Sequence, residues 1–159
     1  MAEHVRDGAA SPLEVQVAML LGLPRTLGGA GISGITLNEP IRLNRAARRI
    51  ARRETCYGDV CVEPVLGGRP VIVECQSAWA HDNAESFVSD SDRKTALELM
   101  GYAVVLVTAH QVRDMTIWHD IVRHVGALAG VPVRFREKWD EREWELRRSL
   151  FMDWKDLFR

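Results

Sequence analysis

A hairpin of two strand-like segments is the feature that most constrains how this chain can fold. Residues 57–63 and residues 70–76 are rich in β-branched and apolar side chains, and residues 64–69 between them contain a Gly-Gly pair. Short apolar segments separated by a glycine-containing turn are typical of two strands that run back along one another. The chain is therefore expected to contain a sheet that includes this hairpin.

The end of the second strand carries the residues with the most specific chemistry. Side chains alternate between the two faces of a strand, so Glu74 and Gln76 share one face and Cys75 points to the other. On the neighbouring strand, Asp59 can lie beside Glu74. Two carboxylates and an amide oxygen are hard ligands, suited to a Mg²⁺ ion that keeps several waters. The sequence thus predicts a site for Mg²⁺ or Mn²⁺ formed by Asp59 and Glu74.

Four blocks of the chain follow one another at a spacing that resembles a known family. They are residues 11–14, residues 57–59, residues 74–76 with His81 shortly after, and residues 90–93 leading through Gly101 into 104–108. Together they resemble the PD-(D/E)XK nuclease superfamily, in the branch of very-short-patch-repair-type (Vsr-like) endonuclease domains of bacterial proteins. The resemblance extends from about residue 11 to about residue 125.

The resemblance implies a restriction-endonuclease-like α/β core, with a mixed β-sheet flanked by helices. It also implies hydrolysis of DNA phosphodiester bonds with Mg²⁺ as the cofactor. The residues that it implies are Asp59, Glu74, Gln76 and His81 as catalytic groups, Asp59 and Glu74 as metal ligands, and Glu14 and Arg93 as residues that support them.

Two departures from the family pattern favour an alternative function. Gln76 fills a position that usually holds Lys or Asp, and Ser77 stands where a glycine is often expected. An amide cannot supply the positive charge of a lysine. The alternative is therefore a nuclease-like module that binds DNA or a protein and cleaves weakly or not at all, as part of a regulator or toxin system.

A cluster of arginines predicts a surface that contacts phosphates. The net charge of the chain is only -1, so binding to nucleic acid has to come from a local patch. At three- and four-residue spacing on a helix, one face would hold Arg45, Arg48, Arg49 and Arg52, and the other side Ala47, Ile50 and Ala51. DNA is therefore the expected partner. The alternative is a solvated helix in a chain that is rich in arginine throughout.

Length and composition indicate one globular domain. The chain has 159 residues, of which 47% are hydrophobic and 27% charged. Residues 1–10 are expected to be a disordered lead-in, and residues 11–130 the restriction-endonuclease-like domain. Residues 131–159 are predicted to form an amphipathic helix rich in aromatic side chains. This helix would pack on the domain or on a partner, with a homodimer as the alternative.

The sequence also bears on location and on the state of the cysteines. No apolar stretch approaches the roughly 20 residues that a bilayer span needs, and the N-terminus lacks the order of a signal peptide. No membrane partner and a cytoplasmic location are therefore expected. Cys56, Cys61 and Cys75 are an odd number in apolar, strand-like surroundings, which favours reduced and buried thiols.

The remaining segments are expected to surround the sheet. Helical patterns cover residues 12–23, residues 90–101 and residues 115–129. Residues 102–108 form a nearly continuous apolar run, which predicts a central strand buried on both faces. Residues 77–89 have no clear period, and the interpretation is a polar stretch that forms one wall of the site.

Overall fold

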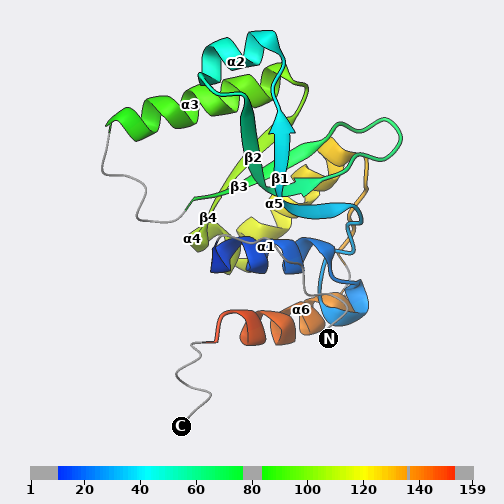
Figure 1. Cartoon of the computed structure of the whole chain (residues 1–159). Helices are drawn as coiled ribbons and strands as arrows, with labels where there is room; N and C mark the ends of the chain where they lie inside the picture. Colours follow the sequence, from blue (N-terminus) through cyan, green and yellow to red (C-terminus); the bar gives the residue numbers. More distant parts are fainter. Residues whose placement is uncertain (1–10, 77–83, 136, 153–159) are drawn as a thin grey trace.

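The computed structural model describes residues 11–76, 84–135 and 137–152. Strands and helices alternate along these ranges (Figure 1). In chain order the elements are α1 Pro12–Gly22, the 3-10 helix η2 Arg25–Leu27, β1 Ile35–Arg42, α2 Arg45–Ala51, β2 Thr55–Val62, β3 Val71–Gln76, α3 Ala84–Leu99, β4 Ala103–Thr108, α4 Ala109–Arg113, α5 Met115–Ala129 and α6 Glu137–Leu150.

The strands of the described ranges form one mixed sheet in the order β1-β2-β3-β4. Neighbours among β1, β2 and β3 are antiparallel, whereas β4 runs parallel to β3. A parallel pair needs a crossover connection, and α3 lies within it. The predicted α/β fold with a mixed sheet and flanking helices is therefore confirmed. The predicted central position of the last strand is wrong, because β4 lies at the edge of the sheet and its Leu106 is 43% exposed.

Each face of the sheet carries its own hydrophobic core. Val71 and Val73 of β3 belong to the core that also contains residues of α1 and α5, whereas Ile72 belongs to the core with residues of α2 and α3. A strand buried on both faces has an uninterrupted apolar run, which is the pattern of these three residues. In Figure 1, α2 and α3 lie on one side of the sheet and α1 on the other, with α6 as a further layer outside α1.

Capping side chains explain where two of the helices begin. Ser11 accepts a hydrogen bond from the backbone N–H of Glu14 (3.3 Å), as its predicted role of N-cap requires. Thr108 and Gln111 form a capping box at the start of α4, a short helix that was not predicted from the sequence. Within the described ranges, no helix has the length and apolar character needed to cross a membrane.

The crossover helix α3 is longer than its predicted extent. It begins at Ala84 and includes residues 84–89, which were predicted to be part of a non-helical polar stretch. That prediction is wrong for residues 84–89. Residues 77–83, the rest of the predicted wall, lie outside the described residues. The predicted end is confirmed, since Gly101 has a φ of 92° and its N–H donates to the Glu98 carbonyl at 3.0 Å.

The C-terminal helix α6 packs on η2 and α1 of the same chain. Trp139 is buried in the core beside α1, and its indole N–H donates to the Gly28 carbonyl at 3.0 Å. Gly28 has a φ of 90°, and a Cβ there would lie 2.4 Å from the Arg142 carbonyl oxygen. Only glycine permits so close an approach of η2 to α6. Trp144, on the other side of α6, is 54% exposed, and a homodimer through this side stays a prediction.

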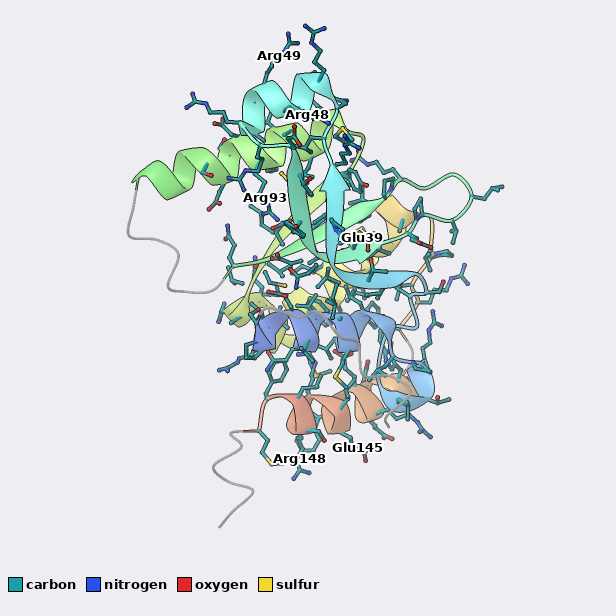
Figure 2. The ribbon with its side chains drawn as sticks, in the orientation of Figure 1. Glu39, Arg48, Arg49, Arg93, Glu145 and Arg148 are labelled. Atoms are coloured by element: carbon teal, nitrogen blue, oxygen red, sulfur yellow. The ribbon has the colours of Figure 1, made fainter. Side chains whose placement is uncertain are left out.

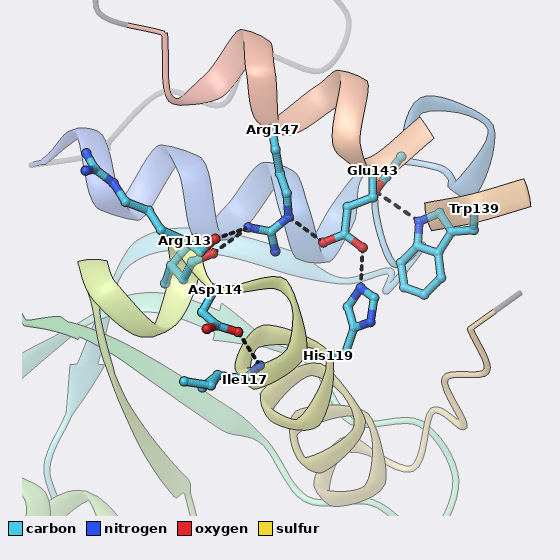
Figure 3. A network of polar contacts seen from close by, with 9 residues as sticks. Arg113, Asp114, Ile117, His119, Trp139, Glu143 and Arg147 are labelled. Carbon is cyan, nitrogen blue, oxygen red and sulfur yellow. Dashed lines mark hydrogen bonds and ion pairs between the residues drawn. The ribbon is translucent and has the colours of Figure 1, made fainter. Parts of the chain in front are cut away.

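A buried polar network joins α6 to α4 and α5 (Figure 3). Glu143 is 1% exposed. Its Oε2 lies 2.6 Å from His119 Nε2, and its Oε1 accepts a 2.7 Å bond from Arg147 Nε. Arg147 also donates to the Val112 carbonyl at 2.6 Å, and the His119 ring stacks on Phe135. The packing of α6 therefore depends on polar side chains that are buried from water and bond to one another.

Glu143→Ala is expected to lower the free energy of unfolding by about 3–5 kcal/mol. The variant would leave the buried guanidinium of Arg147 without its carboxylate. Urea denaturation measures the loss. The matched control is Glu145→Ala on the exposed side of the same helix (Figure 2), for which the expected change is within about 0.5 kcal/mol. Equal losses in the two variants would show that this network does not anchor α6.

Candidate active site where β2 and β3 separate

β2 and β3 stop pairing just before the predicted acidic residues. The register between them covers only three residue pairs. Beyond these pairs, side chains bond to the backbone of the two strands. Asp59 Oδ2 accepts a 2.8 Å hydrogen bond from the N–H of Cys75, and Arg93 Nη2 donates to the carbonyl of Tyr57. These backbone groups have no β2–β3 pairing partner beyond the three pairs, and the two charged side chains bond to them instead.

Glu74, the acidic residue of β3, is buried near the end of the strand. It is 5% exposed, and both of its carboxylate oxygens accept hydrogen bonds from Arg93. One of these, from Nη2 to Oε1, measures 2.9 Å. Figure 2 shows Arg93 extending from α3 towards the sheet, where its guanidinium bonds to Glu74. A two-pronged contact of this kind is among the stronger pairings between charged side chains.

Glu14 approaches the same region from α1. It is 5% exposed, its Oε1 accepts a 2.8 Å bond from the Ser11 hydroxyl, and its Oε2 accepts a 3.1 Å bond from Asn38 Nδ2. Asn38 has a φ of 48°, a left-handed conformation that asparagine tolerates better than most residues. The β1–β2 pairs on either side place Asn38 across from Asp59. Glu14 is thereby held on the side of the sheet where Asp59 lies.

Burial and neighbouring carboxylates raise the pKa values of Asp59 and Glu74. For Asp59, burial contributes most, the hydrogen bond from the Cys75 N–H lowers the pKa, and the charge of Glu14 raises it. For Glu74, burial and then the charge of Asp59 raise the pKa to about 7, although Arg93 opposes them. Arg93 lowers the pKa values of both Asp59 and Glu74, so its charge acts on both carboxylates. Asp59 and Glu74 therefore lie close enough to interact through their charges.

Two neighbouring carboxylates are ligands of the kind that a divalent cation uses. Mg²⁺ is usually bound by one or two carboxylates, with waters and a substrate phosphate completing its shell. Asp59 and Glu74 are two carboxylates on neighbouring strands. In the part of the chain that the structure describes, no three His, Cys, Asp or Glu side chains are grouped to hold a metal ion. An ion held by Asp59 and Glu74 alone would keep several waters.

Two other predicted catalytic residues lie at or beyond the end of β3. Gln76 is its last residue, half-buried and paired in register with Thr108 of the parallel strand β4. Strand alternation places its side chain on the same face as that of Glu74. His81 falls outside the described residues, so its catalytic role stays a prediction.

Two polar groups that shape the site were not predicted from the sequence. They are the side chain of Asn38, which bonds to Glu14, and the carbonyl of Tyr57, which accepts from Arg93. For Asn38, the sequence offered one signal, a polar asparagine within a strand-like segment. A backbone carbonyl leaves no signal in a sequence, because its partner follows from the three-dimensional arrangement.

The arginine-rich helix α2 packs on α3 and presents an exposed row of arginines. It is shorter than predicted, since Arg52 follows its last residue as a C-cap with a φ of 54°. Ala47 and Ala51 are buried as predicted. Arg45, Arg49 and Arg52 are exposed, and Figure 2 shows Arg49 at the outer end of the molecule. These three arginines retain the exposure that a contact with phosphates requires.

Arg48 differs from the rest of the predicted row. Its Nε donates to the carbonyl of Leu43 at 2.7 Å, and its Nη1 lies 3.7 Å from Glu54. These contacts hold the connections at the two ends of α2. Arg53, just beyond α2, donates to the Ser89 hydroxyl of α3 at 3.4 Å. The basic surface therefore extends from α2 onto the helix that carries Arg93.

We expect the stability of the protein to fall as the pH rises towards 7, and Glu74→Gln to reduce this fall. The pKa of Glu74 rises from an ordinary 4.5 to about 7 in the folded protein. The folded protein therefore keeps this proton at pH values where the unfolded chain has released it. The resulting stabilisation is present at low pH and disappears as the pH rises from about 4.5 to about 7.

Urea denaturation at intervals across this pH range measures the effect. The matched control is Glu63→Gln, which removes an exposed carboxylate and should keep the pH dependence of the parent. An unchanged fall in Glu74→Gln would contradict the prediction, since the proton would then be bound elsewhere.

Comparisons with protein-family models, with curated proteins and with solved structures give no match to this chain. The functional interpretation therefore rests on the geometry of the site itself. That geometry consists of a buried and a half-buried carboxylate on adjacent strands, one arginine that bonds to Glu74 and to the Tyr57 carbonyl, and an exposed basic helix packed on α3.

Proposed function

We propose that the chain is a Mg²⁺-dependent endonuclease that hydrolyses DNA phosphodiester bonds, with a restriction-endonuclease-like core of the Vsr-like PD-(D/E)XK type. The observation that carries this proposal is that Asp59 and Glu74 lie on adjacent strands where β2 and β3 stop pairing, close enough for the charge of Asp59 to raise the pKa of Glu74. Two carboxylates this close repel each other, and a divalent cation bound by both would relieve that repulsion.

The residues of the site would have separate roles in the reaction. Asp59 and Glu74 would hold the cation between two adjacent strands. Bound there, Mg²⁺ would lower the pKa of a coordinated water and offset charge on the scissile phosphate. Gln76 would orient the water through its amide, without the positive charge of a lysine. Glu14 would add negative charge on the side of Asp59.

The exposed arginines supply the contact with DNA in this proposal. Arg45, Arg49 and Arg52 lie on or next to α2, and Arg53 links the end of that helix to α3. These arginines would hold a duplex on the side of the molecule that α2 and α3 form (Figure 1). Arginine contacts with phosphates bind without reading sequence, so this surface explains affinity and not the choice of target.

Asp59→Asn and Glu74→Gln are expected to lower Mg²⁺-dependent nicking of supercoiled plasmid by about 100-fold or more. Both substitutions keep the shape of the side chain, and the amide oxygen introduced at position 59 could still accept from the Cys75 N–H, so the fold should survive. EDTA should abolish nicking by the parent. Glu63→Gln, the exposed carboxylate control, should nick as the parent does.

Replacing Arg45 and Arg49 together by Gln is expected to weaken binding to duplexes of any sequence. The slope of log K against log salt should fall by about one unit for each arginine–phosphate pair that the substitutions remove. Fluorescence anisotropy at several salt concentrations measures both quantities. The matched control replaces Arg134 and Arg148, exposed arginines outside the basic surface, and should leave the slope unchanged. Equal effects of the two double substitutions would remove the helix from the proposed interface.

A binding module is the second candidate function. Two observations favour it: Gln76 stands where a lysine would supply charge, and Arg93 engages both oxygens of Glu74. A module of this kind would bind DNA, or a protein partner, and cleave nothing. Duplex binding without nicking in Mg²⁺ or Mn²⁺ would establish it. Nicking by the parent that is abolished in Glu74→Gln would rule it out.

A further inference from the structure

Arg93 covers the carboxylate on which the proposed metal site depends. Its Nη2 donates to Glu74 Oε1 at 2.9 Å, and its Nη1 donates to Oε2 of the same carboxylate. The side chain of Arg93 is 22% exposed and that of Glu74 is 7% exposed. The arginine is thus the partner that solvent reaches more easily.

A divalent cation cannot join this pair without a change. Glu74 would have to give the cation at least one oxygen, and both oxygens are already engaged by the arginine fork. In addition, a guanidinium and a divalent ion on one carboxylate would repel each other, with an energy that grows with the product of their charges. The arginine and the cation are therefore rivals for Glu74.

A second contact allows Arg93 to give up Glu74. Its Nη2 also donates to the carbonyl of Tyr57, on the other side of the separation between β2 and β3. This carbonyl is a neutral acceptor that does not depend on Glu74. An arginine displaced from the carboxylate would therefore keep one partner in the sheet and would need only a small movement of a long side chain.

We infer that Arg93 and a divalent cation compete for Glu74, and that this competition sets how tightly the site binds its cation. The inference rests on the proposed function, because it requires a cation at Asp59 and Glu74. In the cation-free protein Arg93 neutralises Glu74 and closes the site. An arginine that only supported Glu74 would have the opposite effect, since its removal would weaken cation binding.

Titration with Mn²⁺ alone, at one fixed pH, tests the inference. The paramagnetic resonance signal of free Mn²⁺ gives the bound fraction for the parent and for the variants Arg93→Gln and Arg93→Lys. Arg93→Gln should bind Mn²⁺ about tenfold more tightly than the parent, because it removes both the rival and its charge. Arg93→Lys should fall between them, since an ammonium cannot engage both oxygens as a guanidinium does. The matched control Arg148→Gln removes an exposed arginine outside the basic surface and should bind as the parent does.

The outcomes separate this inference from the proposed function. If the parent binds Mn²⁺ and Asp59→Asn does not, the site stands. Equal or weaker binding by Arg93→Gln would then overturn the competition alone. If neither the parent nor Arg93→Gln binds Mn²⁺, the metal site and the competition both fail.

A second measurement follows Arg93 in the parent and does not depend on how well the variants fold. Nitrogen-15 spectra should show slowly exchanging guanidinium N–H groups for Arg93 in the cation-free protein, because both oxygens of Glu74 hold them. Saturating Mg²⁺ should shift these signals and speed their exchange. Signals that stay unchanged while Mg²⁺ is bound would show that the cation does not displace the arginine.

Discussion

The separation of β2 from β3 beyond Val60 and Val73 is the constraint on which the site depends. Two antiparallel strands that stop pairing leave backbone N–H and C=O groups without a partner on the neighbouring strand. Here the carboxylate of Asp59 and the guanidinium of Arg93 supply partners, to Cys75 N–H and to the Tyr57 carbonyl. Each of these two bonds places a charged side chain at the sheet. The interruption of strand pairing therefore creates a charged site.

The two cores hold the strands in this separated arrangement. Side-chain alternation in β2 is not regular, because a Cβ at Gly58 would lie 2.5 Å from the Cys61 sulfur, and these two positions therefore face the same way. Cys61 belongs to the core under α2 and α3, whereas Val60 and Val62 belong to the core beside α1 and α5. The strand thus changes its facing at Asp59, which leaves that carboxylate near Glu14 as well as near β3. A larger residue at position 58 would force the strand out of this path.

Local sequence patterns predict individual strands and helices better than they predict the order of the sheet or the contacts of the site. The hairpin, the helix of residues 115–129 and the N-cap Ser11 follow from periodicity and capping, which are properties of short segments. The edge position of β4 could not be predicted in this way. A strand in the centre of a sheet and an edge strand that packs on a core with one face can have the same apolar sequence. The contact between Arg93 and Glu74 joins residues far apart in the chain, and its two-pronged geometry arises only from the crossing of α3 over the sheet.

Arg93 and Gln76 together connect the proposed chemistry with its proposed control. In the proposed reaction, a positive charge at the position of Gln76 would help to stabilise the phosphate in the transition state, and an amide cannot supply it. Arg93 is the guanidinium already placed at the carboxylates, but in the cation-free protein Glu74 neutralises it. If a cation replaced Arg93 as the partner of Glu74, the guanidinium of Arg93 would become available to contact the phosphate. The arginine that closes the site without a cation would then compensate for the missing lysine once a cation is bound.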